Sequence, residues 1–165
     1  MTQVNYCLKC GSKLSTQNID GRDYQACSEE GCDYVFWDNP LPVVAALIEY
    51  QGNVLLARNK LWGPKMFGLI TGFLEKGESP ENAVLREVKE ELDLDAAVES
   101  LIGLYAFERQ NQLLIVYHLK AEGAIKLSEE LVEVISLPPE KVRPWNFGTG
   151  PAVRDWLTQR GIDPK

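Results

Sequence analysis

Histidine is nearly absent from this chain of 165 residues, which contains only His118. A single histidine excludes a metal site built from several histidines, and residues 116–119 around it show no sign of a catalytic triad. We therefore expect His118 to be an ordinary residue of a strand.

Long apolar runs and an excess of positive charge are missing too. No stretch of 18 apolar residues occurs, which excludes a transmembrane helix, and residues 1–8 lack the apolar core of a signal peptide, so we expect a cytoplasmic protein. The 17 Lys and Arg residues against 24 Asp and Glu give a net charge of −7, which argues against general binding to nucleic-acid backbones. The length allows one medium domain with a small appendage.

Cysteine is absent after residue 32, and the four that occur form two closely spaced pairs: Cys7 with Cys10, and Cys27 with Cys32. This spacing suits one Zn²⁺ held by four thiolates, which would leave no position for water and would therefore be structural. Two disulfides or four unrelated thiols are the alternatives, and a cytoplasmic location disfavours disulfides. A segment of this length has too little core to fold well alone, so a metal would supply stability.

Two prolines, Pro40 and Pro42, follow the cysteine segment and mark a boundary. We predict a zinc ribbon over residues 1–38 and a larger domain over residues 40–165. In the larger domain, hydrophobic patterning predicts a helix over residues 150–161 and strands over residues 43–50, 54–58, 101–107, 113–121 and 132–137. Strands interleaved with two helices predict the α/β class, with a mixed sheet between helical layers.

The most specific pattern lies in residues 72–94, where glycines bracket a short loop before an acidic helix. Ser79 is a suitable N-cap, Pro80 suits the first helical position, and the helix should run to about Leu92. The spacing of Glu87, Glu90 and Glu91 puts all three on one helix face, where like charges repel.

A divalent cation would remove that repulsion. Carboxylates suit Mg²⁺ or Mn²⁺, and substrate phosphates would complete the coordination. We expect Arg86 and Glu78 to join loop and helix through an ion pair, which would leave the other glutamates free for metal. A glutamate-rich helix is often only a solvated surface, but the fixed spacing of glycine, arginine and glutamates favours the metal-binding interpretation.

These residues resemble the Nudix box, Gly-x5-Glu-x7-Arg-Glu-U-x-Glu-Glu-x-Gly-U, in which U is a bulky aliphatic residue. The chain matches the box at Gly72, Glu78, Arg86, Glu87, Val88, Glu90, Glu91 and Leu94. It departs at Asp93, where the family has a glycine in left-handed geometry, which Asp tolerates better than most residues. The resemblance implies an α/β/α sandwich over about residues 40–161.

The resemblance also implies hydrolysis of the pyrophosphate bond in a nucleoside diphosphate linked to another group. It implies catalytic roles for Arg86 and for Glu87, Glu90 and Glu91, of which the three glutamates would be metal ligands. The carbonyl of Thr71 and a later glutamate would complete the metal site. Glu130 is the candidate for that glutamate, with Glu129 and Glu133 as rivals, and the general base is not assigned.

A four-cysteine ribbon in front of such a domain resembles the NADH pyrophosphatase branch and the zinc-bearing FAD and ADP-ribose pyrophosphatases. The NADH branch has a further signature rich in Ser, Gln, Pro and Trp, which this chain lacks; residues 108–114 occupy the corresponding region. ADP-ribose, NADH or FAD is therefore the expected substrate class. A nucleoside triphosphate pyrophosphatase and a non-catalytic ligand-sensing module are the alternatives, and the resemblance implies a homodimer.

Aromatic and arginine side chains are the candidates for substrate contacts, because bases stack on aromatic rings and guanidinium groups pair with phosphate. Most aromatic residues fill cores and most arginines lie on surfaces, so each single assignment is weak. We expect contacts from Arg58, Phe67, Phe107 and Arg109, while Trp62, Arg143, Trp145 and Phe147 are further candidates.

Overall fold

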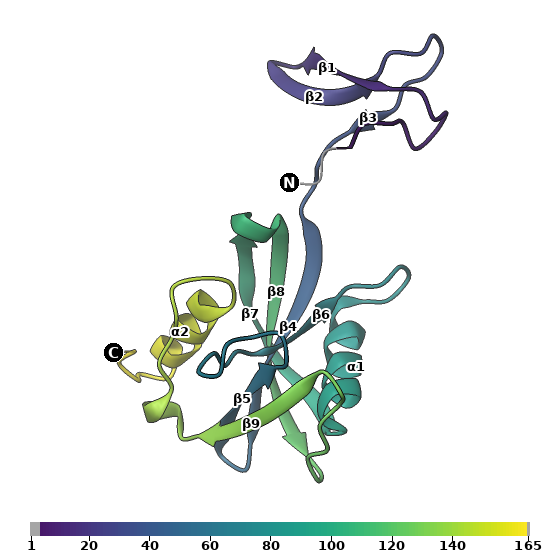
Figure 1. Ribbon diagram of the computed structural model, residues 1–165. Coiled ribbons are helices and arrows are strands. Elements are labelled where there is room, and N and C mark those ends of the chain that lie inside the picture. The colour runs from purple at the N-terminus through teal and green to yellow at the C-terminus, as the bar shows by residue number, and fades with distance from the viewer. Residues whose placement is uncertain (1–3, 165) are drawn as a thin grey trace. The chain divides into compact units, whose positions relative to one another are not determined.

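The computed structural model describes residues 4–164 (Figure 1). The chain divides into two compact units, of which the N-terminal unit ends at Asn39 and the C-terminal unit begins at Pro40. Within the described residues, no helix is long and apolar enough to cross a membrane.

The N-terminal unit contains an antiparallel sheet with the order β1-β2-β3, formed by β1 (Leu14–Ile19), β2 (Arg22–Cys27) and β3 (Val35–Phe36). The turn between β1 and β2 places Asp20 and Gly21 at positive φ, which is the geometry of a tight two-residue hairpin. Among the described residues of this unit, only Cys7, Ala26 and Cys27 are buried. Such a small core cannot stabilise the unit alone.

The C-terminal unit is built on a six-stranded mixed sheet. Its order is β7-β8-β4-β5-β9, and β6 pairs with β4 beside β5. Only the β4–β8 pairing is parallel among these strand pairs. The strands are β4 (Leu41–Tyr50), β5 (Asn53–Asn59), β6 (Ile70–Phe73), β7 (Asp95–Phe107), β8 (Gln112–Glu122) and β9 (Leu131–Leu137).

Strand β4 lies at the centre of the sheet and contributes to two hydrophobic cores. Val44, Ala46 and Ile48 pack in the core that includes α1 (Pro80–Leu92). The alternate residues Val43, Ala45 and Leu47 pack in the core that includes α2 (Gly150–Gln159). Because successive side chains of a strand point to opposite faces, the two helices cover opposite faces of the sheet (Figure 1). The expected α/β/α sandwich with a mixed sheet is therefore confirmed.

Helix α1 has the predicted ends. The Ser79 side chain accepts a hydrogen bond from the backbone N–H of Asn82, and Pro80 occupies the first turn. At the other end, Asp93 adopts left-handed geometry with φ 56° and donates its N–H to the Lys89 carbonyl. Asp93 thus takes the conformation that the sequence pattern reserves for glycine.

Several features differ from the sequence-based expectations. Strand β7 begins at Asp95 rather than at residue 101, because its first half is an outer strand with exposed and polar residues that lacks an apolar run. The C-terminal helix ends at Gln159. Gly72, expected at a loop, lies within β6. Short 3-10 helices follow β7 and β9, at Glu108–Gln110 and Pro139–Lys141.

Candidate active site

Gly72 and Glu87 make the closest approach between β6 and α1. A Cβ atom placed on Gly72 would lie 1.9 Å from Cδ of Glu87, so any side chain larger than hydrogen would displace that carboxylate. The φ angle of Gly72 is not positive, unlike that of Gly77 in the following loop. Gly72 is therefore required for the space that it leaves to Glu87, and it lies in a strand rather than at the edge of a loop.

Arg86 joins the loop before α1 to the acidic face of the helix. Its guanidinium makes two hydrogen bonds to Glu78, of 2.8 and 3.2 Å, and Nη2 also donates to the carbonyl of Phe73. These hydrogen bonds from Arg86, together with one from the backbone N–H of Glu75, lower the pKa of the Glu78 carboxyl. The expected ion pair between Arg86 and Glu78 is present and holds the loop against the helix.

The same guanidinium also reaches two of the glutamates expected to be free. Nη1 of Arg86 lies 2.7 Å from Glu87 Oε1 and 3.2 Å from Glu90 Oε2. The expectation that Arg86 would leave these carboxylates unpaired is therefore wrong, because one guanidinium has enough donors to serve three acids. A cation that binds here must share Glu87 and Glu90 with Arg86.

Glu91 is in a different position from its two neighbours. Its side chain makes no hydrogen bond or ion pair within residues 4–164. Burial, followed by the negative charges of Glu87, Glu130 and Glu90, raises the pKa of Glu91 to about 7. A partly buried carboxylate without a positive partner, in a group of acids, fits a hard divalent cation as its missing partner.

Two backbone hydrogen bonds place the segment after β8 at the end of α1. Ser128 donates its N–H to the carbonyl of Glu91, and Lys126 donates to that of Leu92. As a result, Glu130 lines the cavity of about 70 Å³ that Glu91 and Thr71 of β6 also line. Of the rival glutamates, Glu133 instead pairs with Arg58 at 3.1 Å.

A second cavity, of about 350 Å³, adjoins the first, because Trp62, Leu69 and Thr71 line both. Three of the expected substrate contacts, Phe67, Phe107 and Arg109, line this larger cavity. Its size is typical of a pocket for a small organic ligand. Of the residues that line it, Arg109 is the charged one, so an aromatic group is the part of a nucleotide that fits it.

Arg58 does not line either cavity. Its ion pair with Glu133 joins β5 to β9 across neighbouring strands. A structural role at the sheet surface accounts for this arginine in the present structure.

The four cysteines of the N-terminal unit come together as expected. All four Sγ atoms lie within 4.8 Å of one another. Cys7 and Cys32 are separated by 3.7 Å and Cys10 and Cys27 by 3.5 Å, close to the roughly 3.8 Å between sulfurs of a tetrahedral zinc site. The backbone N–H of Lys9 points to Cys7 Sγ at 3.3 Å, which would stabilise a thiolate there.

His118 is a buried strand residue, as predicted. It lies on β8, 5% exposed, with Nε2 3.0 Å from Glu49 Oε2. Burial lowers its pKa, so the ring is neutral at physiological pH. Arg160 also binds Glu49 and stacks over Trp156, which ties the end of α2 to the sheet.

Residues 39–156 match the family model for the NUDIX domain, which covers most of the chain. This chain belongs to the Nudix family. The acidic helix α1 and the loop clamped by Arg86 are therefore its Nudix box. Among curated relatives, an NAD-capped RNA hydrolase NudC from Pseudomonas aeruginosa is 29% identical over 129 residues, which cover 78% of this chain and 45% of that protein. An ADP-ribose pyrophosphatase from Methanocaldococcus jannaschii is 35% identical over 104 residues, 61% of this chain and 62% of that protein.

The chain spans about half the length of the NudC proteins that it matches. Among solved structures, a Nudix hydrolase from Nitrosomonas europaea superimposes with a TM-score of 0.76 at 20% identity, covering 97% of this chain and 95% of that one. An ADP-ribose pyrophosphatase from Streptococcus suis gives a TM-score of 0.62 at 17% identity, covering 74% of this chain and 92% of that one. At these identities the agreement concerns the fold.

Trp62 is one of the further aromatic candidates named from the sequence. It lines both cavities, and its ring packs on Gly68, where an added Cβ would lie 3.1 Å from Cη2. The sequence Trp62-Gly63-Pro64 is typical of a loop but does not show the direction that the loop takes. The packing of Trp62 on Gly68 depends on where the strands on either side of this loop, β5 and β6, place the two residues. The sequence alone does not show that placement.

Proposed function

We propose that this chain hydrolyses the pyrophosphate bond of a nucleoside diphosphate linked to another group, of the ADP-ribose, NADH or FAD class. A bound Mg²⁺ or Mn²⁺ would neutralise charge on the phosphate oxygens. Glu87, Glu90, Glu91 and Glu130 would hold it, together with the carbonyl of Thr71. Products would be a nucleoside monophosphate and a second phosphate compound.

One observation carries this proposal: the unpaired Glu91 carboxylate shares a cavity with Thr71 and Glu130, next to an aromatic cavity. The acids have the hard oxygen atoms that Mg²⁺ and Mn²⁺ prefer, and burial with mutual repulsion favours a cation among them. The names of the relatives agree with this substrate class, since they include hydrolysis of NAD-capped RNA and of ADP-ribose.

The residues of the box have separate tasks in the proposed reaction. Arg86 fixes the loop of residues 73–78 through Glu78 and orients Glu87 and Glu90. Gly72 leaves space for the Glu87 carboxylate beside β6. The aromatic cavity, with Phe67 and Phe107, would hold the base and exclude water from that end of the substrate.

We also propose that the four cysteines hold one structural Zn²⁺ in a ribbon over residues 1–38. Four thiolates complete a tetrahedral shell, so this ion would take no part in hydrolysis. A cytoplasmic location and a homodimer remain our predictions.

The test is phosphate release from ADP-ribose, NADH, FAD, diadenosine polyphosphates and nucleoside triphosphates, coupled to alkaline phosphatase, with and without Mg²⁺ or Mn²⁺. We expect metal-dependent turnover of a dinucleotide or nucleotide sugar, and loss of that turnover in Glu91→Gln with an unchanged circular dichroism spectrum. Preference for triphosphates would identify a triphosphate pyrophosphatase instead. No turnover of any substrate by folded, zinc-loaded protein would favour the non-catalytic module.

A further inference from the structure

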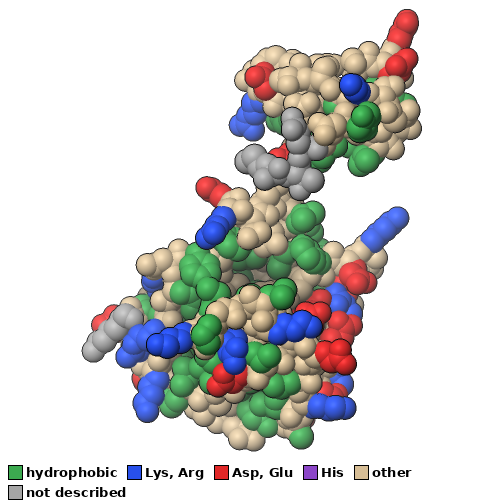
Figure 2. Space-filling model, in the orientation of Figure 1, with side chains coloured by type: hydrophobic (Ala, Val, Ile, Leu, Met, Phe, Trp, Pro, Cys, Tyr) green, Lys and Arg blue, Asp and Glu red, His purple; other side chains and the backbone are tan. Residues whose placement is uncertain are grey.

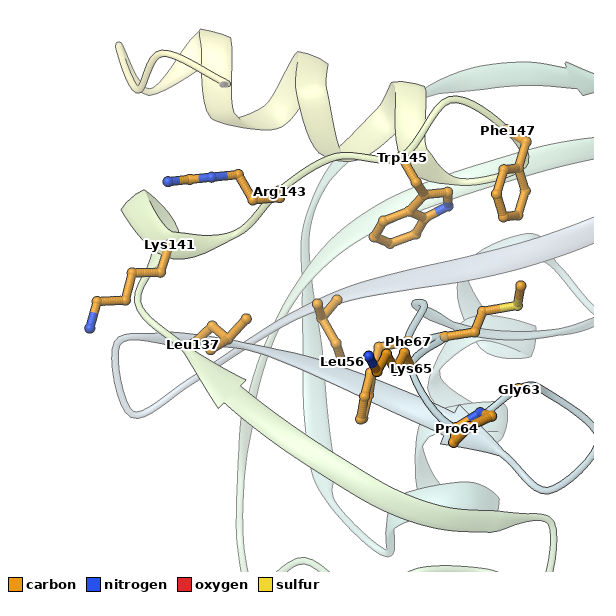
Figure 3. Close-up of a pocket in the computed structure, with 11 residues that line it drawn as sticks. Leu56, Gly63, Pro64, Lys65, Phe67, Leu137, Lys141, Arg143, Trp145 and Phe147 are labelled. Carbon is orange, nitrogen blue, oxygen red and sulfur yellow. The ribbon is translucent and has the colours of Figure 1, made fainter.

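A third cavity, of about 720 Å³, continues the aromatic cavity away from the acidic cluster. The two share four residues, Met66, Phe67, Trp145 and Phe147. In Figure 3, Trp145 and Phe147 stand on the segment before α2, while Leu56 and Phe67 lie across from them. Glu91 and Thr71 do not line this third cavity, so the three cavities follow one another outward from the carboxylates.

Charge changes sign along this series of cavities. The cavity at Glu91 contains the carboxylates, whereas none of the 11 residues that line the third cavity is acidic. Three of the 11 are cationic: Lys65, Lys141 and Arg143. Figure 2 shows most of the acidic side chains of this face gathered over α1, where basic side chains also lie, while mainly basic side chains occur along the side that carries α2.

The three cations have no acidic partners among residues 4–164. The side chains of Lys65 and Lys141 make no hydrogen bond or ion pair there. Arg143 donates Nη1 to the carbonyls of Glu140 and Val142, at 2.8 and 3.2 Å, which fixes its position without neutralising its charge. In a chain with a net charge of −7, a cavity edge with three cations and no acid is suited to an anion.

We propose that this third cavity binds a phosphate group carried on the 2′ or 3′ oxygen of the ribose of the substrate, beside the base and away from the bond that is cleaved. The inference rests on the proposed function, since it places the pyrophosphate at the carboxylates and the base in the aromatic cavity. A phosphate monoester carries a charge of about −1.5 to −2 at pH 7, which suits several cations, and the planar guanidinium of Arg143 can contact two of its oxygens.

Two pairs of substrates test this, each differing by one phosphate ester: NADPH against NADH for the 2′ position, and coenzyme A against its 3′-dephospho form for the 3′ position. We expect kcat/KM with Mg²⁺ to be about tenfold higher for the phosphorylated member of at least one pair, which is about 1.4 kcal/mol. The ratio should fall as salt is added, because the cations are exposed and are screened.

Lys141→Gln with Arg143→Gln should bring that ratio close to one. Lys141→Gln alone, which leaves the Arg143 hydrogen bonds in place, should lower it partly. Lys120→Gln is the matched control: it removes one positive charge from β8, where Lys120 pairs with Glu99 at 3.1 Å, and should keep the wild-type ratio. Equal kcat/KM within both pairs, or a ratio that survives the double substitution, would overturn the proposal.

Binding separates this inference from the proposed function. Binding to the Glu91→Gln protein with Mg²⁺ can be measured by calorimetry. If the 2′ position is preferred, ADP-ribose 2′-phosphate should bind more tightly than ADP-ribose. If the 3′ position is preferred, coenzyme A should bind more tightly than its 3′-dephospho form. Such a difference without any turnover by the wild type would support the anion site and reject hydrolysis. Preference for an NAD-capped oligonucleotide, with no effect of either monoester, would instead identify an RNA end as the ligand and reject the monoester.

Discussion

Adding one methyl group at Gly72 tests whether Glu87 must lie against strand β6. In Gly72→Ala, the new Cβ would sit 1.9 Å from Cδ of Glu87, whereas ordinary contact begins at 3.4 Å, so the carboxylate must move by about 1.5 Å (3.4 − 1.9). A misplacement of about 1 Å at a catalytic group costs roughly a hundredfold in rate. We therefore expect kcat/KM to fall about 100-fold, equivalent to about 2.7 kcal/mol.

Stability should change little in this variant, because the backbone of Gly72 is not in the left-handed region and alanine fits a strand. The expected change in the free energy of unfolding is within about 1 kcal/mol, measured by urea denaturation. The assay is the coupled phosphate release over a range of Mg²⁺ concentrations, in which Gly72→Ala should also need more metal.

A double-mutant cycle provides the control. If Gly72→Ala acts by displacing the Glu87 carboxylate, it should have little further effect in a Glu87→Ala background. Additive losses from the two substitutions, or full activity in Gly72→Ala, would refute the argument that this glycine provides space for that carboxylate.

Three further predictions concern other parts of the molecule. The raised pKa of Glu91 means that the folded state retains a proton which the unfolded chain has lost. The free energy of unfolding in metal-free buffer should therefore fall as pH rises from about 4.5 to about 7. Glu91→Gln should flatten that pH dependence and be more stable than wild type at pH 8, by up to about 2 kcal/mol in urea titrations. If the free energy of unfolding has the same pH dependence in both proteins, the pKa of Glu91 is not raised. Cys10→Ser should lower the zinc content, measured by mass spectrometry, below one equivalent. It should also make residues 4–39 sensitive to protease, while the C-terminal unit stays folded. If residues 4–39 stay resistant to protease without zinc, their small core is enough to keep them folded. Asp93→Gly should raise Tm by about 2–4 °C by relieving left-handed strain, despite the loss of the Lys89 ion pair, and an unchanged or lower Tm in calorimetry would mean that the ion pair offsets that strain.

The sequence predicted the fold class, both helices and the cluster of four cysteines, because each has a local signature. Ser79, Pro80 and Asp93 define the ends of α1 through short-range geometry alone. The 2- and 4-residue spacings of the cysteines restrict the chemistry in the same way. Family membership followed from the fixed spacing of the box and is now confirmed.

Features that depend on pairs distant in sequence could not be predicted in this way. The contact of Gly72 with Glu87 depends on the packing of α1 against β6, and Arg86 reaches Glu87 and Glu90 because of rotamers that spacing does not specify. The first half of β7 is defined by its pairing with β8, and its own residues carry little strand signal. Phe67, Phe107 and Arg109 meet in one cavity only after the sheet is complete.

The parallel pairing of β4 with β8 has a consequence for how this chain folds. Leu41 pairs with Gln112, a separation of 71 residues (112 − 41), and the register continues to Tyr50 with Ala121. During synthesis β4 can pair with β5 and β6 as soon as these emerge, but its other edge has no partner until residue 122 has left the ribosome. Such distant pairing slows folding, and an unpaired edge can associate with other chains in the meantime. The central strand that supports both cores is therefore the segment most exposed to misassembly until β8 arrives.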